Sequence, residues 1–427
     1  MLLYVRPVSI VSGQAVQIRY YPVPTPHGAP RAITVDSAGN VWFTEDNLTI
    51  NKIGVLTPSN GSIREYPIPS PQAEARSITV SPNGTVWFAE HGANKIGALS
   101  PATGRITEWP IFAEDGWGRP EGGIGFDSTS HLWFIEPIAW DIKGIGSVDS
   151  LDPQTGNVTK YPAPTCTAVN SLNQTDILSI LTALLVDRHD DVWFTDTNCN
   201  WLGRLTLGNA HFTLYPLPFI RKLWTPGPGL GDWGGLTLDQ TGKLWFTEDY
   251  AHKIGMLDPS TGLVKEWAFS APSNITGGPT NLALDSKGHV WFTQACETPS
   301  GDWTTCNIAM LDPGSGIFRD YELRSDVRGA WGIAVDAKDN VWVAGQGWNS
   351  IVEVVAESSE TNSATVSTAT ANSSVETVTE TRVNATPINI PEYPSAPAIL
   401  AAMVTVVTLT TGAAKRRLGN SKRRLRR

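Results

Sequence analysis

Short stretches of alternating apolar and polar residues recur along residues 16–357, and Gly, Pro, Asn or Asp bound most of them. Within them the motif Val/Leu-Trp-Phe appears six times, with its tryptophan at positions 42, 87, 133, 193, 245 and 291, and Val341-Trp342-Val343 is a degraded seventh copy. Neighbouring copies are 45 to 60 residues apart, most of them close to the length of one four-stranded blade. The pattern predicts an all-β, seven-bladed β-propeller over residues 16–357.

One repeat can be divided into four strands on local chemistry alone. The expected strands are Arg76–Ser81, Thr85–Glu90, Lys95–Ser100 and Arg105–Pro110. Asn-Gly and Thr-Gly pairs stand between them, where antiparallel hairpins need residues that tolerate a positive φ. Each repeat is therefore predicted to be one antiparallel blade, with its Trp-Phe pair packed against the next blade.

The two ends of the repeat region complement each other. The segment 16–22 resembles the fourth strand of a repeat, whereas the seventh repeat ends after three strands, the last of them at 350–356. We expect the N-terminal strand to complete the last blade, because this pairing leaves no open sheet edge between the first and last blades.

The composition changes beyond residue 357. Residues 358–395 are rich in Ser and Thr and predict a stalk that builds no core of its own. Residues 396–414 carry no charge and are long enough to span a bilayer as a helix. The tail 415–427 holds eight Lys and Arg of a chain whose net charge is −9, so the rest of the chain carries −17. Basic residues stay cytoplasmic, which predicts a single-pass protein with an extracellular propeller; a soluble amphipathic tail is the alternative.

Two further features fit an exported chain. Eight Asn-x-Ser/Thr sequons occur, at Asn47, Asn60, Asn83, Asn157, Asn173, Asn274, Asn372 and Asn384. The four cysteines are expected to form the pairs Cys166–Cys199 and Cys296–Cys306, each bracketing an insertion in one repeat; four buried thiols are the alternative. Residues 1–15 form a poor signal peptide, because Arg6 and Pro7 interrupt the apolar stretch. We interpret Met1 as a mis-assigned start; insertion directed by the C-terminal anchor itself is the alternative.

The recurring phrase Val-Trp-Phe-Thr-Glu followed by Asn-Lys-Ile-Gly, with Glu-Tyr-Pro-Ile-Pro between copies, resembles the virginiamycin B lyase family. The best copies are Val41–Leu56, Val86–Leu99 and Leu244–Leu257, and the likeness covers the propeller region. The resemblance implies an enzyme that opens a cyclic streptogramin B antibiotic by elimination at its ester bond. It also implies Mg²⁺ held by two glutamates and a histidine that acts as general base.

The family's site motif maps onto only part of this sequence. Glu74 and Glu90 stand where the resemblance places the metal ligands, but Arg76 and Arg31 occupy the two histidine positions. Arginine stays protonated and cannot serve as a general base at ordinary pH, so no catalytic residue is assigned. His91 is a substitute in sequence only, because its side chain should point to the opposite side from that of Glu90.

An acidic residue follows the Trp-Phe-x motif in the first five repeats. These residues are Glu45, Glu90, Glu136, Asp196 and Glu248. Rotational symmetry would gather them at one rim of the axis, where they could bind Mg²⁺, Ca²⁺ or a cationic ligand. The alternative is local pairing with basic residues of the same repeat, such as Lys52, Lys95 and Lys253.

The sequence thus leaves two functions open. One is a surface-anchored propeller that binds a small-molecule or cell-surface ligand or a divalent cation at an acidic funnel. The other is a Mg²⁺-dependent carbon–oxygen lyase, or a lactonase-like enzyme, that opens a cyclic ester. The acidic body disfavours nucleic acid as a partner, and no serine-hydrolase, P-loop or dinucleotide motif occurs.

Overall fold

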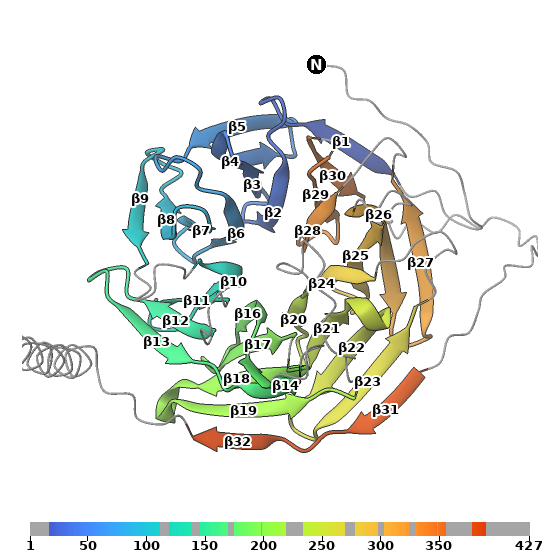
Figure 1. Ribbon diagram of the computed structural model, residues 1–427. Coiled ribbons are helices and arrows are strands. Elements are labelled where there is room, and N and C mark those ends of the chain that lie inside the picture. Colours follow the sequence, from blue (N-terminus) through green and yellow to red (C-terminus); the bar gives the residue numbers. More distant parts are fainter. Residues whose placement is uncertain are drawn as a thin grey trace, which may run out of the picture. The chain divides into compact units, whose positions relative to one another are not determined.

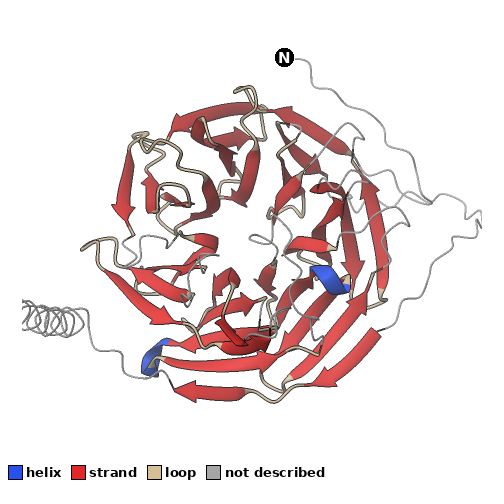
Figure 2. Cartoon of the chain, in the orientation of Figure 1, coloured by secondary structure: helices blue, strands red, loops and turns tan. Residues whose placement is uncertain are grey.

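The computed structural model describes residues 17–111, 119–137, 146–169, 175–197, 199–218, 234–269, 278–297, 303–323, 329–347, 349–355 and 378–389. Residues Met1–Ile388 form one compact unit and Asn389–Arg427 a second, and the description below concerns the first. Its regular structure is almost entirely β-strand (Figure 2), with two short 3-10 helices, η1 (Leu207–Asn209) and η2 (Asp249–Ala251).

Seven antiparallel sheets surround a central axis (Figure 1), which confirms the seven-bladed propeller. Blade one holds β2 (Pro30–Val35), β3 (Val41–Asn47), β4 (Ile50–Thr57) and β5 (Ser62–Pro67); blade two holds β6 (Ala75–Val80), β7 (Val86–Glu90), β8 (Lys95–Leu99) and β9 (Ile106–Pro110). Blade three holds β10 (Glu121–Phe126), β11 (Leu132–Glu136), β12 (Ser147–Leu151) and β13 (Val158–Pro162); blade four holds β16 (Leu181–Val186), β17 (Val192–Asp196), β18 (Trp201–Thr206) and β19 (His211–Pro216). Blade five holds β20 (Leu236–Leu238), β21 (Leu244–Glu248), β22 (Lys253–Asp258) and β23 (Leu263–Ala268); blade six holds β24 (Pro279–Leu284), β25 (Val290–Glu297), β26 (Trp303–Asp312) and β27 (Ile317–Glu322).

The ring closes as the sequence predicts. Blade seven consists of β28 (Ala330–Val335), β29 (Val341–Gly345) and β30 (Ser350–Val354), and the N-terminal strand β1 (Ile18–Pro22) is its outer strand. β1 is antiparallel to β30, with Ile18 opposite Val354 and Pro22 opposite Ser350. The first and last parts of the propeller are therefore held together by a backbone ladder as well as by side chains.

A recurring aspartate secures the first turn of most blades. Asp36 accepts backbone hydrogen bonds from Ala38 and Asn40 through Oδ1, and a bond of 2.9 Å from the Trp42 indole through Oδ2. The same Asp-to-Trp bond, six residues apart, occurs in blades three to seven, at Asp127, Asp187, Asp239, Asp285 and Asp336. Blade two has Ser81 instead, and the buried Trp87 Nε1 has no acceptor.

The phenylalanine of the Trp-Phe motif explains why a glycine follows Lys-Ile in the next strand. A Cβ on Gly54 would lie 2.1 Å from the ring of Phe43, and one on Gly255 would lie 2.2 Å from the ring of Phe246. The glycine leaves room for the ring, which lies across the neighbouring strand and is fully buried. Residues from adjacent blades then pack together, as in the cluster that joins Phe43 to Trp342 of blade seven. The predicted packing of the motif between blades is confirmed.

Two segments extend the basic plan. The insertion in blade four contains a hairpin, β14 (Cys166–Val169) and β15 (Thr175–Leu178), and Cys166 forms a disulfide with Cys199. Blade six is lengthened because β25 and β26 continue outward to Glu297 and Trp303. The side chains of Cys296 and Cys306 lie outside the described residues, and their pairing stays a prediction.

Part of the expected stalk belongs to the propeller instead. β31 (Val378–Arg382) pairs with β23 as a fifth strand of blade five, and β32 (Thr386–Asn389) is the fifth strand of blade four. Residues 378–389 of the expected stalk, which we call the strap, therefore form outer strands of two blades. Backbone pairing holds the strap without a core of its own, because most of its described side chains are exposed.

No helix in the described part of the chain is long and apolar enough to cross a membrane. The predicted anchor at 396–414, the basic tail at 415–427 and the segment 1–15 lie outside the described residues.

Candidate functional site

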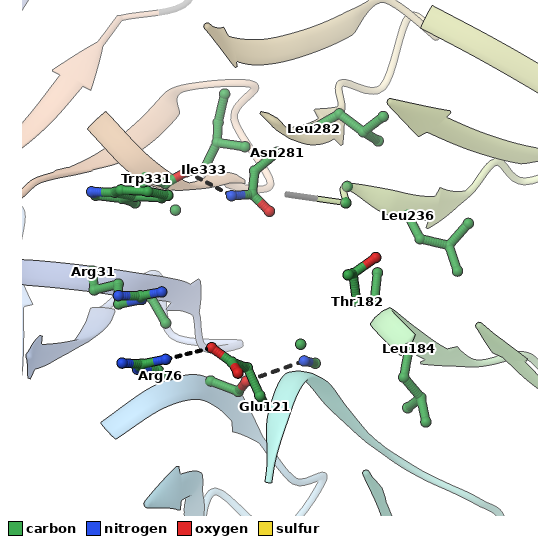
Figure 3. A pocket seen from close by; sticks show the side chains of 18 of the residues that line it. Arg31, Arg76, Glu121, Thr182, Leu184, Leu236, Asn281, Leu282, Trp331 and Ile333 are labelled. Carbon is green, nitrogen blue, oxygen red and sulfur yellow. Dashed lines mark hydrogen bonds and ion pairs between the residues drawn. The ribbon is translucent and has the colours of Figure 1, made fainter. Parts of the chain in front are cut away.

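The innermost strands of the blades surround a cavity of about 210 Å³ on the propeller axis. Its wall is rich in glycine, because neighbouring inner strands approach closely: a Cβ on Gly122 would lie 2.3 Å from the Thr182 carbonyl oxygen, and one on Gly332 would lie 2.6 Å from that of Arg31. Leucine and isoleucine side chains line part of the wall, while Arg31, Arg76, Glu121 and Asn281 supply polar groups (Figure 3).

Arg31 is one of the charged residues at this cavity. Its guanidinium donates to Asp46 Oδ2 at 2.8 Å and lies over the ring of Trp331, 5.1 Å from the ring centroid. Burial lowers the pKa of Arg31, although Asp46 opposes that effect. An aromatic face and a carboxylate together compensate a guanidinium that has lost most of its water.

Arg76 occupies the equivalent position in blade two and contacts three carboxylates. Its nitrogens lie 2.7 Å from Glu121 Oε1, 3.0 Å from Glu74 Oε2 and 3.9 Å from Asp46 Oδ2. Glu74 is held in the left-handed region, with φ 46°, at the entry to β6. With Arg31 on Trp331, these contacts link blades seven, one, two and three through one network, which we call the arginine cluster: Arg31, Asp46, Glu74, Arg76, Glu121 and Trp331.

His91 also belongs to this region. It follows Glu90 directly, and its Nδ1 lies 3.4 Å from Glu121 Oε2. Burial, and then the positive charge of Arg76, lower the pKa of His91 to about 2. The sequence indicates that His91 points away from Glu90. It does not identify the neighbours on that other side, because Glu121 comes from the next blade, 30 residues further along the chain.

The acids after Trp-Phe-x do not form the expected rim. Glu45 is buried inside blade one, and its pKa is raised to about 8 by burial and by the nearby Glu65. Glu65 in turn accepts a bond of 2.8 Å from Lys52 and bonds from Thr25. A protonated Glu45, an ionised Glu65 and a charged Lys52 make a neutral group, so the acid is accommodated locally.

The same arrangement recurs in blades two and five. Burial and Glu108 raise the pKa of Glu90 to about 8, and Lys95 bonds Glu108 at 2.8 Å. Burial and Glu266 raise the pKa of Glu248 to about 8, with Lys253 2.9 Å from Glu266. We call these groups, with the one in blade one, the carboxyl triads.

Blades three, four and six show variants of the triad. In blade three the Lys and acid exchange strands: Lys160 Nζ lies 2.5 Å from Glu136, and burial with Glu136 raises the pKa of Asp149 to about 8. In blade six Gln294 replaces the protonated acid and donates to Asp320 at 2.9 Å.

In blade four Asp196 instead accepts bonds from the Ser179 hydroxyl at 2.6 Å and from the Cys199 N–H at 2.9 Å. None of the five predicted rim acids lines the axial cavity. These five acids therefore do not form the expected funnel at this cavity. The local alternative fits only in part, because Lys52, Lys95 and Lys253 bond a second acid of the blade (Glu65, Glu108 and Glu266).

The two glutamates of the predicted metal pair have different neighbours. A Cβ on Gly92 would lie 3.2 Å from Glu74 Cδ, whereas a Cβ on Gly97, in β8, would lie 2.7 Å from Glu90 Oε1. Glu74 is bonded to Arg76, and Glu90 faces Glu108 and Lys95 inside blade two. Among the described residues, no three His, Cys, Asp or Glu side chains are arranged to hold a metal ion. Mg²⁺ held by Glu74 and Glu90 therefore stays a prediction.

Comparisons with known proteins agree with this architecture. The model of the virginiamycin B lyase family matches residues 11–222. Virginiamycin B lyase from Staphylococcus aureus superposes with a TM-score of 0.62 at 24% identity, covering 80% of this chain and all of the enzyme. A streptogramin B lyase structure gives a TM-score of 0.61 at 25% identity, covering 79% of this chain and 97% of that one. No curated protein sequence matches the chain.

Proposed function

Starting from a chain that is a seven-bladed propeller of the virginiamycin B lyase-like family, we propose that it binds a small, uncharged, polar ligand at the axial cavity without breaking it. The observation that carries the proposal is the arginine cluster. At the two positions where the resemblance expects histidines, Arg31 and Arg76 are bound to carboxylates.

The residues of the cluster are poorly suited to elimination at an ester. A general base needs a pKa near the working pH, and an arginine side chain stays protonated there. His91 lies in the cluster, but a pKa of about 2 makes it too weak a base to remove a proton from carbon at neutral pH. Arg31, Arg76 and His91 therefore supply no base for the lyase or the lactonase-like alternative at this cavity.

The chemistry of the wall favours a neutral ligand. The cluster holds two arginines and three carboxylates, so its charges are nearly balanced. Together with the amide oxygen of Asn281 (Figure 3), it offers donors and acceptors side by side, as hydroxyl groups require.

The volume limits the size of the ligand. Pockets for drug-sized ligands measure roughly 300–1,000 Å³, and this cavity, at about 210 Å³, lies below that range. It suits a ligand of monosaccharide size. A divalent cation is not part of the proposal, because the carboxylates of the cluster are bonded to arginine.

The setting of the protein is proposed from the sequence. The uncharged segment 396–414, the basic tail 415–427 and the sequons support a single-pass membrane protein with its propeller outside the cell. Its ligand would then be a small molecule in the surroundings or a sugar on a cell surface. The disulfide between Cys166 and Cys199 suits the same compartment.

Calorimetric titration of the full chain in detergent tests the proposal. The probes are a set of five sugars (glucose, galactose, mannose, ribose and arabinose), with sodium acetate, MgCl₂ and CaCl₂ as charged alternatives. We expect heat from at least one sugar, which Asn281→Leu removes and Gln154→Leu, in an exposed turn, leaves unchanged. Heat from acetate or a divalent cation but from no sugar would contradict the proposed ligand, as would no heat from any probe.

A further inference from the structure

Three exposed sequons lie in hairpin turns of the propeller. Asn60 is in the turn between β4 and β5, Asn83 in the turn between β6 and β7, and Asn157 in the turn between β12 and β13; all three side chains are exposed. They belong to blades one, two and three, which are also blades that contribute to the arginine cluster. The order of strands and turns in each blade shows on which face of the propeller these three asparagines lie.

In an antiparallel blade, the turn between the first two strands and the turn between the last two lie at the same end of the strands. Blades related by rotation about one axis put these turns on one face of the propeller. The contacts agree: a groove of about 640 Å³ is lined by both kinds of turn from blades three and four. The turns of these two blades are also bonded, from the Ser128 N–H to Asp190 at 2.7 Å.

The arginine cluster lies at the other end of the strands. Glu74 immediately precedes β6, and His91 immediately follows β7, so both mark the end opposite to the turn that holds Asn83. We call the face with the three sequons the turn face and the opposite one the cluster face.

The side-chain amides on the turn face are available for modification. Asn60 Oδ1 accepts the Ser62 N–H at 2.9 Å, and Asn83 Oδ1 accepts the Thr85 N–H at 3.1 Å. These bonds use the amide oxygen, and within the described residues no hydrogen bond leaves the Nδ2 of Asn60, Asn83 or Asn157.

Asn47, the last residue of β3, provides the contrast. It lies on the cluster face, is only partly exposed, and donates from Nδ2 to the His27 carbonyl oxygen at 3.0 Å. One of the two hydrogens on the atom that would carry a sugar is thus already engaged, and the bond holds the amide against the His27 carbonyl.

We propose that Asn60, Asn83 and Asn157 carry N-linked glycans, so that the turn face is covered by sugar while the cluster face stays open to ligands. The donor would be a glycan linked through phosphate to a lipid. A bond forms between the asparagine Nδ2 and the anomeric carbon, the bond from that carbon to the phosphate oxygen breaks, and one Nδ2 proton is lost to the transferase and solvent. The proposal rests on the export of the propeller and not on the identity of its ligand.

Glycopeptide mass spectrometry on the full chain, purified from its own cells, tests this assignment. We expect glycan mass on the peptides of Asn60, Asn83 and Asn157, and an unmodified Asn47. The substitutions Ser62→Ala, Thr85→Ala and Thr159→Ala should each remove one glycan from the intact mass. Thr49→Ala, which destroys the Asn47 sequon, should remove none.

Labelling of intact cells with a membrane-impermeant amine reagent separates the two parts of the account. A labelled protein with sugar on Asn47, or on fewer than two of the three turn-face asparagines, overturns the glycan assignment alone. A protein that is neither labelled nor glycosylated overturns both the assignment and the proposed export.

Discussion

A glutamine in place of Glu90 should stabilise the propeller, and the gain should grow with pH. Glu90 is fully buried, and its pKa in the folded protein is raised to about 8 from an ordinary value of 4.5. Between these two values the folded state holds a proton that the unfolded state has released. Binding of this proton to the folded state contributes fully to the free energy of unfolding below pH 4.5. The contribution is lost progressively as the pH rises from 4.5 toward 8. Glutamine keeps a neutral donor at the same place and does not titrate.

The magnitude follows from the size of the shift. Each pH unit between 4.5 and 8 changes the free energy of unfolding of the natural protein by about 1.4 kcal/mol relative to the variant. Glu90→Gln should therefore gain up to roughly 3 kcal/mol at pH 7 and little near pH 4.5. Blade six supports the expectation, because Gln294 already donates to Asp320 at the equivalent place.

Thermal or denaturant unfolding of both proteins at pH 5, 6, 7, 8 and 9 measures the difference. We expect a stability difference that widens to about pH 8 and then stays constant. Asp196→Asn is the matched control: the Asp196 carboxylate accepts hydrogen bonds from Ser179, Ile180 and Cys199, so its amide should destabilise the protein by about 1–3 kcal/mol at neutral pH. A Glu90→Gln difference that does not change with pH would refute the carboxyl triad.

Three other substitutions test which contacts stabilise the propeller, and each is measured as a shift in the unfolding midpoint. Ser81→Asp should raise stability by about 1 kcal/mol, because it supplies the acceptor that the buried Trp87 indole lacks; an unchanged or lower midpoint would contradict this. Gly122→Ala should cost more than about 2 kcal/mol, since its Cβ would meet backbone at 2.3 Å. Gly39→Ala, at a similar φ with open space around it, should cost only about 1 kcal/mol, and equal losses would show that the close contact is irrelevant. Deleting residues 378–389 should leave the propeller folded with a slightly lower midpoint; loss of cooperative unfolding would show that the strap is essential.

Much of the fold can be predicted from the sequence because each blade repeats the same strand motif and the same turn residues. The spacing of the Trp-Phe motif predicts seven blades, and the match between segment 16–22 and a fourth strand predicts the closure. The strap escapes prediction because β31 and β32 bind by backbone pairing at a sheet edge, which leaves little trace in residue type.

The site is less predictable than the fold. Alternation along a strand shows that Glu90 and His91 face opposite ways, but not which of them faces the axis. Two partners of Arg76 come from the end of β3 and from β10, so their meeting depends on the geometry of three blades. The departure from the family's histidines is visible in the sequence, whereas the network that replaces them is not.

The direct test of the account is an assay of the full chain with a streptogramin B antibiotic and Mg²⁺, followed by liquid chromatography and mass spectrometry. Elimination opens the ring to an isomer of unchanged mass, and hydrolysis adds one water, so both outcomes are visible. We expect neither product above the protein-free control, because Arg31 and Arg76 stand in place of a base. An opened product that increases in proportion to the protein would contradict a propeller that binds without catalysis.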